Sequence, residues 1–138
     1  PFLSRDAEQI AAIRRGGYVL READNARAVL IATGSEVELA LKAQALLAEE
    51  GIAVRVVSMP STNVFDRQDK AYIASVLPAG LPRVAVEAGV SDFWRKYVGL
   101  EGGVVGLDHF GESAPAKQLF EAFGFTAANV AQTVKSVL

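Results

Sequence analysis

The 138-residue sequence has no cysteine and only one histidine, His109. Without cysteine the chain cannot form a disulfide, use a thiolate nucleophile or bind zinc through sulfur. A single histidine also excludes a histidine-rich metal site. The lack of cysteine is compatible with a reducing compartment, and we expect a cytoplasmic protein.

The sequence also lacks an excess of charge of one sign and a long apolar run. Its 14 basic and 16 acidic side chains are mixed along the chain and give a net charge of −2. Nucleic-acid recognition needs a basic face, so no nucleic-acid partner is expected. No run of about 18 apolar residues is present to span a bilayer, and the N-terminal residues do not resemble a signal peptide. We therefore expect no membrane association.

The residues that are present predict one compact domain. Hydrophobic residues make up 51% of the chain, and 138 residues are enough to bury a sizeable core. The first residue is Pro1 and not methionine, so we expect a piece of a longer protein. Residues 1–17 are predicted to be an N-terminal connector with a short helix that Gly16 and Gly17 end.

Residues 28–57 predict a strand, a helix and a second strand. The apolar, partly β-branched run at 29–31 suits a strand that is covered on both faces. Ser35 can cap the helix that follows, and Glu38 can return a hydrogen bond to the cap, which makes a capping box. Gly51 suits the left-handed position after the helix, and residues 54–57 form the next strand.

The start of this helix is also a candidate anion site. Backbone N–H groups and the helix dipole can hold a phosphate or a carboxylate there, and open α/β sheets place ligands at the carboxyl ends of their strands. The residues of this candidate anion or regulatory site are Thr33, Gly34, Ser35, Glu87 and His109. A capping box explains the first three without a ligand, and Glu36 adds a negative charge. We therefore favour the structural interpretation.

The rest of the chain repeats the alternation of strands and helices. Further strands are expected at 18–20, 83–87 and 104–107, and Asp69 and Thr126 can cap further helices. These elements predict an α/β domain with about five strands, covered on both faces.

Two segments carry side chains that suit a functional site. Residues 91–97, SDFWRKY, gather three aromatic side chains that suit either the core or a protein interface, and we leave both open. The loop at 108–115 contains His109, Glu112 and Ser113, whose side chains are able to do acid–base or nucleophilic chemistry. No phosphate-binding loop, dinucleotide fingerprint or nucleophile elbow accompanies them, so a self-contained hydrolase is disfavoured.

Eight phrases of the sequence resemble the C-terminal portion of bacterial transketolase. They are RRGGYVL (14–20), IATGSEVELA (31–40), RVVSMPST (55–62), FDRQD (65–69), RVAVEAG (83–89), KYVGL (96–100), FGESAP (110–115) and FEAFGFTAANV (120–130). They cover nearly the whole chain in order. The resemblance makes residues 18–138 the transketolase C-terminal domain and residues 1–17 a connector from the preceding pyrimidine-binding domain.

The resemblance implies a three-layer α/β/α domain with a mixed, mostly parallel sheet. It also implies a homodimeric parent enzyme of the pentose phosphate pathway. Such an enzyme moves a two-carbon ketol unit between sugar phosphates, with thiamine diphosphate and a divalent metal, magnesium or calcium. The partners of this chain would be the N-terminal and middle domains of the parent, and its role structural, dimer-supporting or regulatory.

No catalytic or metal-binding residue is assigned to this chain. The family's cofactor, metal and substrate-phosphate residues lie in the two preceding domains, and Ser4-Arg5 falls in the connector. The isolated chain is therefore expected to be inactive and to bind neither cofactor. Two alternatives stay open: an independent anion-binding α/β module, and the last domain of a related thiamine enzyme. The related enzyme would be a 2-oxo acid dehydrogenase or deoxyxylulose phosphate synthase, but GSEVELA, SMPST and FGESAP favour transketolase.

Overall fold

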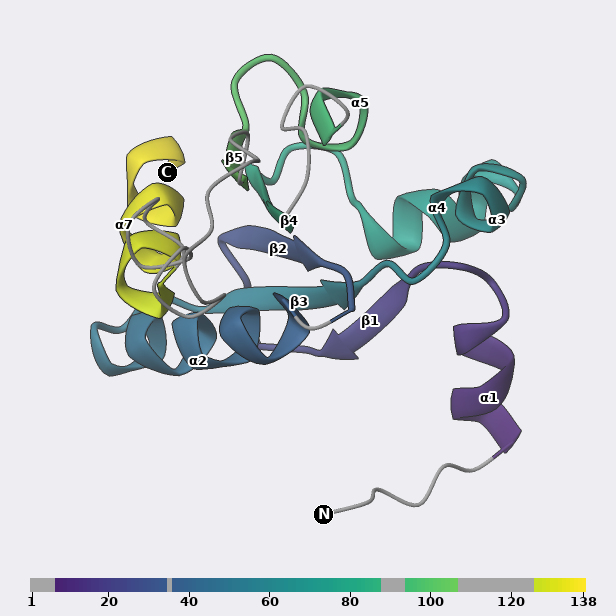
Figure 1. Ribbon diagram of the computed structural model, residues 1–138, viewed down its shortest axis with the longest axis horizontal. Coiled ribbons are helices and arrows are strands. Elements are labelled where there is room, and N and C mark those ends of the chain that lie inside the picture. The colour runs from purple at the N-terminus through teal and green to yellow at the C-terminus, as the bar shows by residue number, and fades with distance from the viewer. Residues whose placement is uncertain (1–6, 35, 88–93, 107–125) are drawn as a thin grey trace, which may run out of the picture.

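The computed structural model describes residues 7–34, 36–87, 94–106 and 126–138. Its centre is a five-stranded sheet with the order β1-β3-β2-β4-β5 (Figure 1). The strands are β1 (Tyr18–Arg21), β2 (Ala28–Ala32), β3 (Val54–Ser58), β4 (Arg83–Glu87) and β5 (Gly103–Gly106). All neighbouring pairs are parallel except β1 with β3, which is antiparallel. The predicted mixed, mostly parallel sheet is therefore confirmed.

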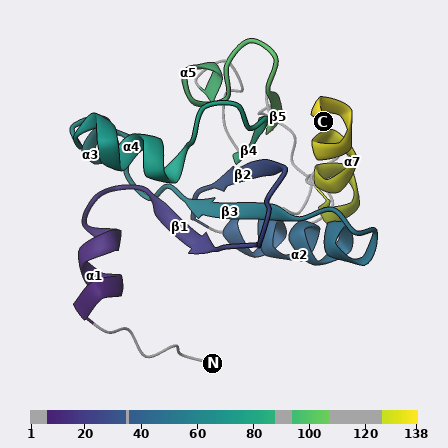
Figure 2. The same ribbon diagram turned by 180° about the vertical axis from the view of Figure 1, so that it is seen from behind.

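Helices cover both faces of this sheet (Figures 1 and 2). The described helices are α1 (Ala7–Ile13), α2 (Glu36–Glu49), α3 (Thr62–Asp66), α4 (Lys70–Val76), α5 (Arg95–Val98) and α7 (Ala127–Val137), and all except α1 take part in this covering. Side chains of α2 and α7 form one buried cluster with the sheet, and those of α3, α4 and α5 form a second one on the opposite face. The three-layer α/β/α architecture is thus confirmed, with α1 outside the layers.

Strand β2 shows why the sheet needs both helix layers. Ala28, Leu30 and Ala32 belong to the cluster under α2 and α7, whereas Val29 and Ile31 belong to the cluster under α3, α4 and α5. All five side chains are fully buried. Successive side chains of a strand point to opposite faces, so an uninterrupted apolar strand must be covered on both sides.

Three residues predicted to cap or end helices do so in the structure. The Asp69 carboxylate accepts a hydrogen bond from the backbone N–H of Tyr72 at 2.7 Å, and the Thr126 hydroxyl accepts one from Asn129 N–H at 3.1 Å. These bonds satisfy N–H groups that have no partner within the helix. Gly51, with φ of 78°, follows the last turn of α2 in the left-handed conformation.

Helix α2 has 14 residues and begins at Glu36. Ser35 lies outside the described residues, so its predicted capping box stays a prediction. The Glu38 carboxylate lies 3.6 Å from the Lys42 ammonium one turn later. Within the described parts of the chain, no helix is both long and apolar enough to cross a membrane.

The aromatic segment before β5 contributes to the core. Trp94 is 3% exposed and Tyr97 is 4% exposed, and their ring centroids lie 5.3 Å apart. Both pack in the cluster under α3, α4 and α5. For these two side chains the core interpretation is therefore correct. Phe93 lies outside the described residues.

Leu46 and Leu47 on α2 offer a matched pair of variants. Leu47 is fully buried, whereas Leu46 is 38% exposed. We expect Leu47→Ala to lower the free energy of unfolding by about 2–5 kcal/mol because it leaves a cavity in the core. Leu46→Ala should cost less than about 1 kcal/mol. Urea denaturation measures both values, and equal losses would contradict the burial of Leu47.

Candidate functional site

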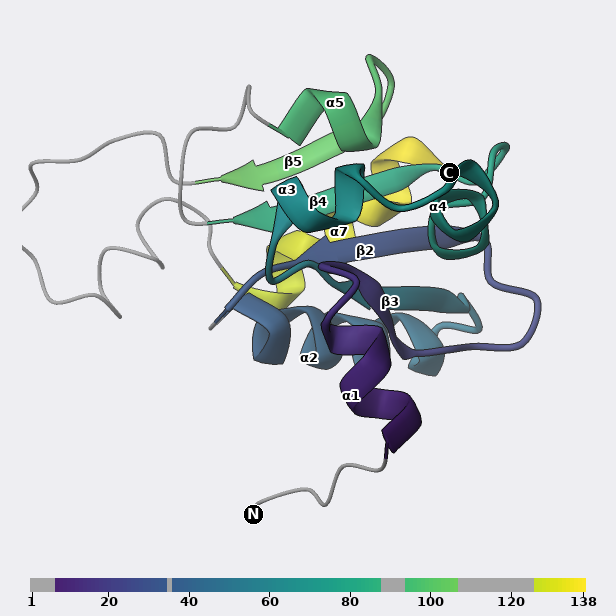
Figure 3. The ribbon, with the colours of Figure 1, turned by 90° about the vertical axis from the view of Figure 1, so that its right-hand side faces the viewer.

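The four parallel strands end at one edge of the sheet. The register pairs Ala32, the last residue of β2, with Ser58 at the end of β3. It also pairs Glu87 at the end of β4 with Gly106 at the end of β5. Figure 3 shows β4 and β5 ending on the same side. The turn after β2 and the end of β4, which both carry predicted site residues, therefore lie at the carboxyl edge.

Two backbone donors at the start of α2, those of Glu36 and Val37, are already used. The carbonyl of Thr33 accepts a hydrogen bond from Glu36 N–H at 3.0 Å, and the carbonyl of Gly34 accepts one from Val37 N–H at 3.3 Å. Glu36 is 7% exposed, and its carboxylate lies 3.9 Å from the point that a Cβ on Gly34 would occupy. A buried carboxylate and occupied donors disfavour an anion at this turn.

Most of the other predicted site residues are not among those that the structure describes. Ser35, His109, Glu112 and Ser113 lie outside the described residues, and Glu87 is placed as the last residue of β4. Across the described residues, no group of three or more His, Cys, Asp or Glu is placed to hold a metal ion. The candidate anion or regulatory site therefore stays a prediction.

At the opposite, amino end of the sheet, two arginines lie on one face. Arg55 of β3 and Arg83 of β4 are both in register with Val29 of β2, one on each side. Val29 packs under α3, α4 and α5, and the alternation of the strands puts both arginines on that same face. Both guanidinium groups donate to carbonyls at the C-terminal end of α4.

Arg55 joins α4 to the turn after β1. One of its terminal nitrogens donates to the carbonyls of Ser75 and Val76, at 2.8 and 3.0 Å. Its other two nitrogens form a two-pronged ion pair with the Glu22 carboxylate, at 3.0 and 2.6 Å. Hydrogen bonds from this guanidinium hold the pKa of Glu22 below its ordinary value.

Arg83 joins α4 to α5. It donates to the carbonyl of Tyr97 at 2.9 Å, and to those of Leu77 and Pro78 at 2.9 and 3.4 Å. Burial lowers the pKa of Arg83 because the charged form loses hydration. These three hydrogen bonds all go to backbone carbonyls, so they orient the side chain without neutralising its charge.

Together the two arginines satisfy the four successive carbonyls of residues 75–78. Carbonyls at the end of a helix lack partners within the helix, and the helix dipole favours a cation there. We did not predict this arrangement from the sequence. The available signal is one arginine near the start of each apolar strand, in VRVVS and RVAVE.

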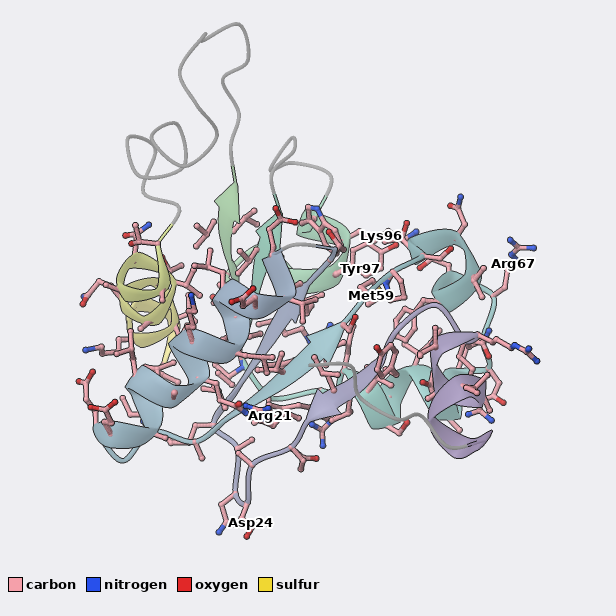
Figure 4. The ribbon with its side chains drawn as sticks, turned by 60° about the horizontal axis from the view of Figure 1, so that its bottom comes forward. Arg21, Asp24, Met59, Arg67, Lys96 and Tyr97 are labelled. Atoms are coloured by element: carbon pink, nitrogen blue, oxygen red, sulfur yellow. The ribbon has the colours of Figure 1, made fainter. Side chains whose placement is uncertain are left out.

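A second polar cluster joins α3 to α5. The Asp66 carboxylate accepts hydrogen bonds from the Lys96 ammonium at 2.6 Å and from the Tyr97 hydroxyl at 3.0 Å. Burial, followed by the contact with Asp66, raises the pKa of Tyr97, which keeps its hydroxyl protonated as a donor. Figure 4 labels Lys96 and Tyr97. With Phe65 and Arg83, these two residues help to line a pocket of about 360 Å³. The charged groups of Asp66, Lys96 and Arg83 each have a hydrogen-bond partner within the domain, so these contacts are explained by the packing of α3 and α5.

A family model described as a transketolase-like C-terminal domain matches residues 16–126. The chain belongs to this family. It is 60% identical to transketolase 1 of Pasteurella multocida over 141 aligned positions, which cover 99% of this chain and 21% of that protein. It is 58% identical to transketolase 1 of Vibrio vulnificus, with 97% of this chain and 20% of that protein covered. This transketolase-like domain thus spans about a fifth of these relatives.

Solved transketolase structures have the same fold. The transketolase of Leishmania mexicana matches with a TM-score of 0.87 and 43% identity, over 94% of this chain and 19% of that one. A Pichia stipitis transketolase in complex with sedoheptulose 7-phosphate matches with a TM-score of 0.85 and 40% identity, over the same shares of the two chains. A split-gene transketolase described as an inactive β4 tetramer matches with a TM-score of 0.70 and 30% identity, over 91% of this chain and 43% of that one. The fold inferred from the resemblance is therefore correct.

The role of Arg83 in the transketolase-like domain can be tested against Arg67. We expect Arg83→Met to lower the free energy of unfolding by about 1–3 kcal/mol, because carbonyls of α4 and α5 lose their donor. Arg67, an exposed side chain that donates to the Asn63 carbonyl at 3.2 Å, is the control. Arg67→Met should cost less than about 0.5 kcal/mol. Similar unfolding midpoints in urea for the two variants would contradict the role of Arg83.

The Glu22–Arg55 pair predicts a loss of stability in acid. Because folding lowers the pKa of Glu22, its stabilising contribution is fully present above about pH 4.5, the ordinary value, and is lost as the pH falls through the folded-state pKa. At pH 7 the free energy of unfolding of Glu22→Gln should therefore be lower than that of the unsubstituted chain, by less than about 1 kcal/mol. At pH 3 the two values should be closer. Urea denaturation at both pH values measures this difference.

The control for this experiment is Glu38→Gln. Glu38 is 79% exposed, and its carboxylate lies 3.6 Å from Lys42, so its contact is weaker than that of Glu22. The difference in unfolding free energy between Glu38→Gln and the unsubstituted chain should change less between pH 7 and pH 3. A Glu22→Gln difference that is the same at both pH values would contradict the ion pair.

Proposed function

We propose that this domain is the C-terminal domain of a transketolase, an enzyme that transfers a two-carbon ketol unit from a ketose phosphate to an aldose phosphate. The observation that carries the proposal is 60% identity to a transketolase over 99% of this chain. The same relatives support transketolase over a 2-oxo acid dehydrogenase or deoxyxylulose phosphate synthase as the parent. The parent would act in the cytoplasm, in the pentose phosphate pathway.

In this proposal the chemistry belongs to the rest of the parent. Thiamine diphosphate and a magnesium or calcium ion would be bound by the preceding N-terminal and middle domains of a homodimer. The support for this division is the match to a C-terminal domain model, because the residues that bind the cofactor and the metal belong to the preceding domains in the resemblance described above. The ion pairs of Arg55 and Lys96 join structural elements of the domain to one another.

The role of the domain itself would be structural. Several of its described polar side chains connect elements of its own fold: Arg55 and Arg83 bind helix carbonyls, Gln44 of α2 donates to the carbonyl of Val54 at 2.9 Å, and Lys135 of α7 pairs with Glu50 at 2.8 Å. Such internal bonding supports a rigid body that assists assembly of the parent and its dimer. We place no step of the reaction on this chain.

The test compares this chain with the parent protein from the same source. With thiamine diphosphate and magnesium supplied, the parent should form sedoheptulose 7-phosphate from xylulose 5-phosphate and ribose 5-phosphate. The 138-residue chain should give no product above background. Mass spectrometry of the products measures both. An inactive but folded and cofactor-loaded parent would contradict the assignment, and activity in this chain alone would contradict the division of roles.

A further inference from the structure

Helix α1 is apolar but belongs to neither core. Five of its seven residues, AEQIAAI, are alanine or isoleucine. Of the α1 side chains that the structure describes, those of residues 10–13, none appears in either buried cluster or among the side chains packed against them. Ile10 is 41% exposed, and Ala11 is exposed as well. Figures 1 and 3 show α1 before the start of β1, at the periphery of the domain.

The end of α1 is nevertheless fixed to the domain. The carbonyl of Gly16 accepts a hydrogen bond from Ser61 N–H at 2.9 Å, and the carbonyl of Gly17 accepts one from the Tyr72 hydroxyl at 2.7 Å. The Arg15 guanidinium lies 4.5 Å from the centre of the Tyr72 ring, within cation–π range.

Gly16 makes this attachment specific. Its φ is 85°, and a Cβ there would collide with the Ser61 carbonyl and the Phe65 N–H. Only glycine therefore permits this close approach of the chain to the start of α3. The direction of α1 is consequently set by the domain and is not that of a freely rotating linker.

A helix of this kind needs a packing partner. Isolated helices shorter than about 12 residues are marginal in water, and α1 has seven residues. Its i→i−4 hydrogen bonding continues to Arg14, whose N–H donates to the Ile10 carbonyl at 3.2 Å. Packing of the exposed Ile10 face against apolar surface would supply the missing stabilisation.

We propose that α1 is a docking helix whose Ile10 and Ala11 face packs on the domain that precedes this one in the parent protein. The proposal rests on the proposed function. This chain covers about a fifth of its transketolase relatives, and its family model is that of a C-terminal domain, so most of the parent precedes it. Helix α1 is the first described element on that side of the chain, which brings the preceding domain next to it.

The test uses the parent protein with two matched variants. Ile10→Asp places a charge on the α1 face, and Leu46→Asp places the same charge at a side chain of similar exposure, 38%, on α2. Hydrogen exchange measures the protection of the amides of residues 10–14. Ile10→Asp should speed their exchange by at least about tenfold, whereas Leu46→Asp should leave it unchanged.

Three results would overturn the proposal. The first is fast exchange of these amides in the parent itself. The second is unchanged exchange in Ile10→Asp. The third is protection that falls on dilution of the parent, which would make a second copy of the protein the partner.

If Ile10→Asp fails to fold, Ile10→Ala gives the same comparison with a smaller expected change. Because exchange does not depend on ketol transfer, an inactive parent with protected α1 amides would contradict only the proposed activity.

Discussion

The attachment of α4 to the sheet through two arginines is the interaction on which one helix layer depends. Arg55 and Arg83 flank Val29 in the register of β3, β2 and β4, and between them they bind the carbonyls of residues 75–78. Arg83 also binds the carbonyl of Tyr97, so α4 and α5 are fixed to the same point of the sheet. Burying these charged groups is costly unless every donor has an acceptor, and the ends of two helices provide acceptors.

This arrangement gives the two faces of the sheet different characters. The face under α2 and α7 is held mainly by apolar packing, with Leu47 and Val130 fully buried. The face under α3, α4 and α5 combines an apolar centre with the arginine contacts at one end and the Asp66, Lys96 and Tyr97 cluster at its side. On this second face, polar contacts therefore supplement apolar packing in fixing the positions of the helices.

The proposed structural role of the domain follows from the partners of its polar side chains. The ion pairs of Arg55, Lys96 and Lys135 connect elements of this domain, and the turn at Thr33 and Gly34 uses its carbonyls to begin α2. A domain built in this way suits a rigid part of a larger enzyme. Helix α1 exposes Ile10 and Ala11 but is fixed at Gly16 and Gly17, and it is the element that we propose contacts the larger assembly.

The order and type of the elements and the family were determined by the sequence, because both are encoded locally. The uninterrupted apolar run of β2 indicates a strand covered on both faces, and Asp69 and Thr126 mark helix starts within a few residues of themselves. The strand order, the arginine contacts and the exposure of α1 were decided only by the tertiary structure. Arg55 meets its carbonyl partners across 20 and 21 residues of chain, and hydrophobic periodicity shows that a face is buried but not which distant group covers it.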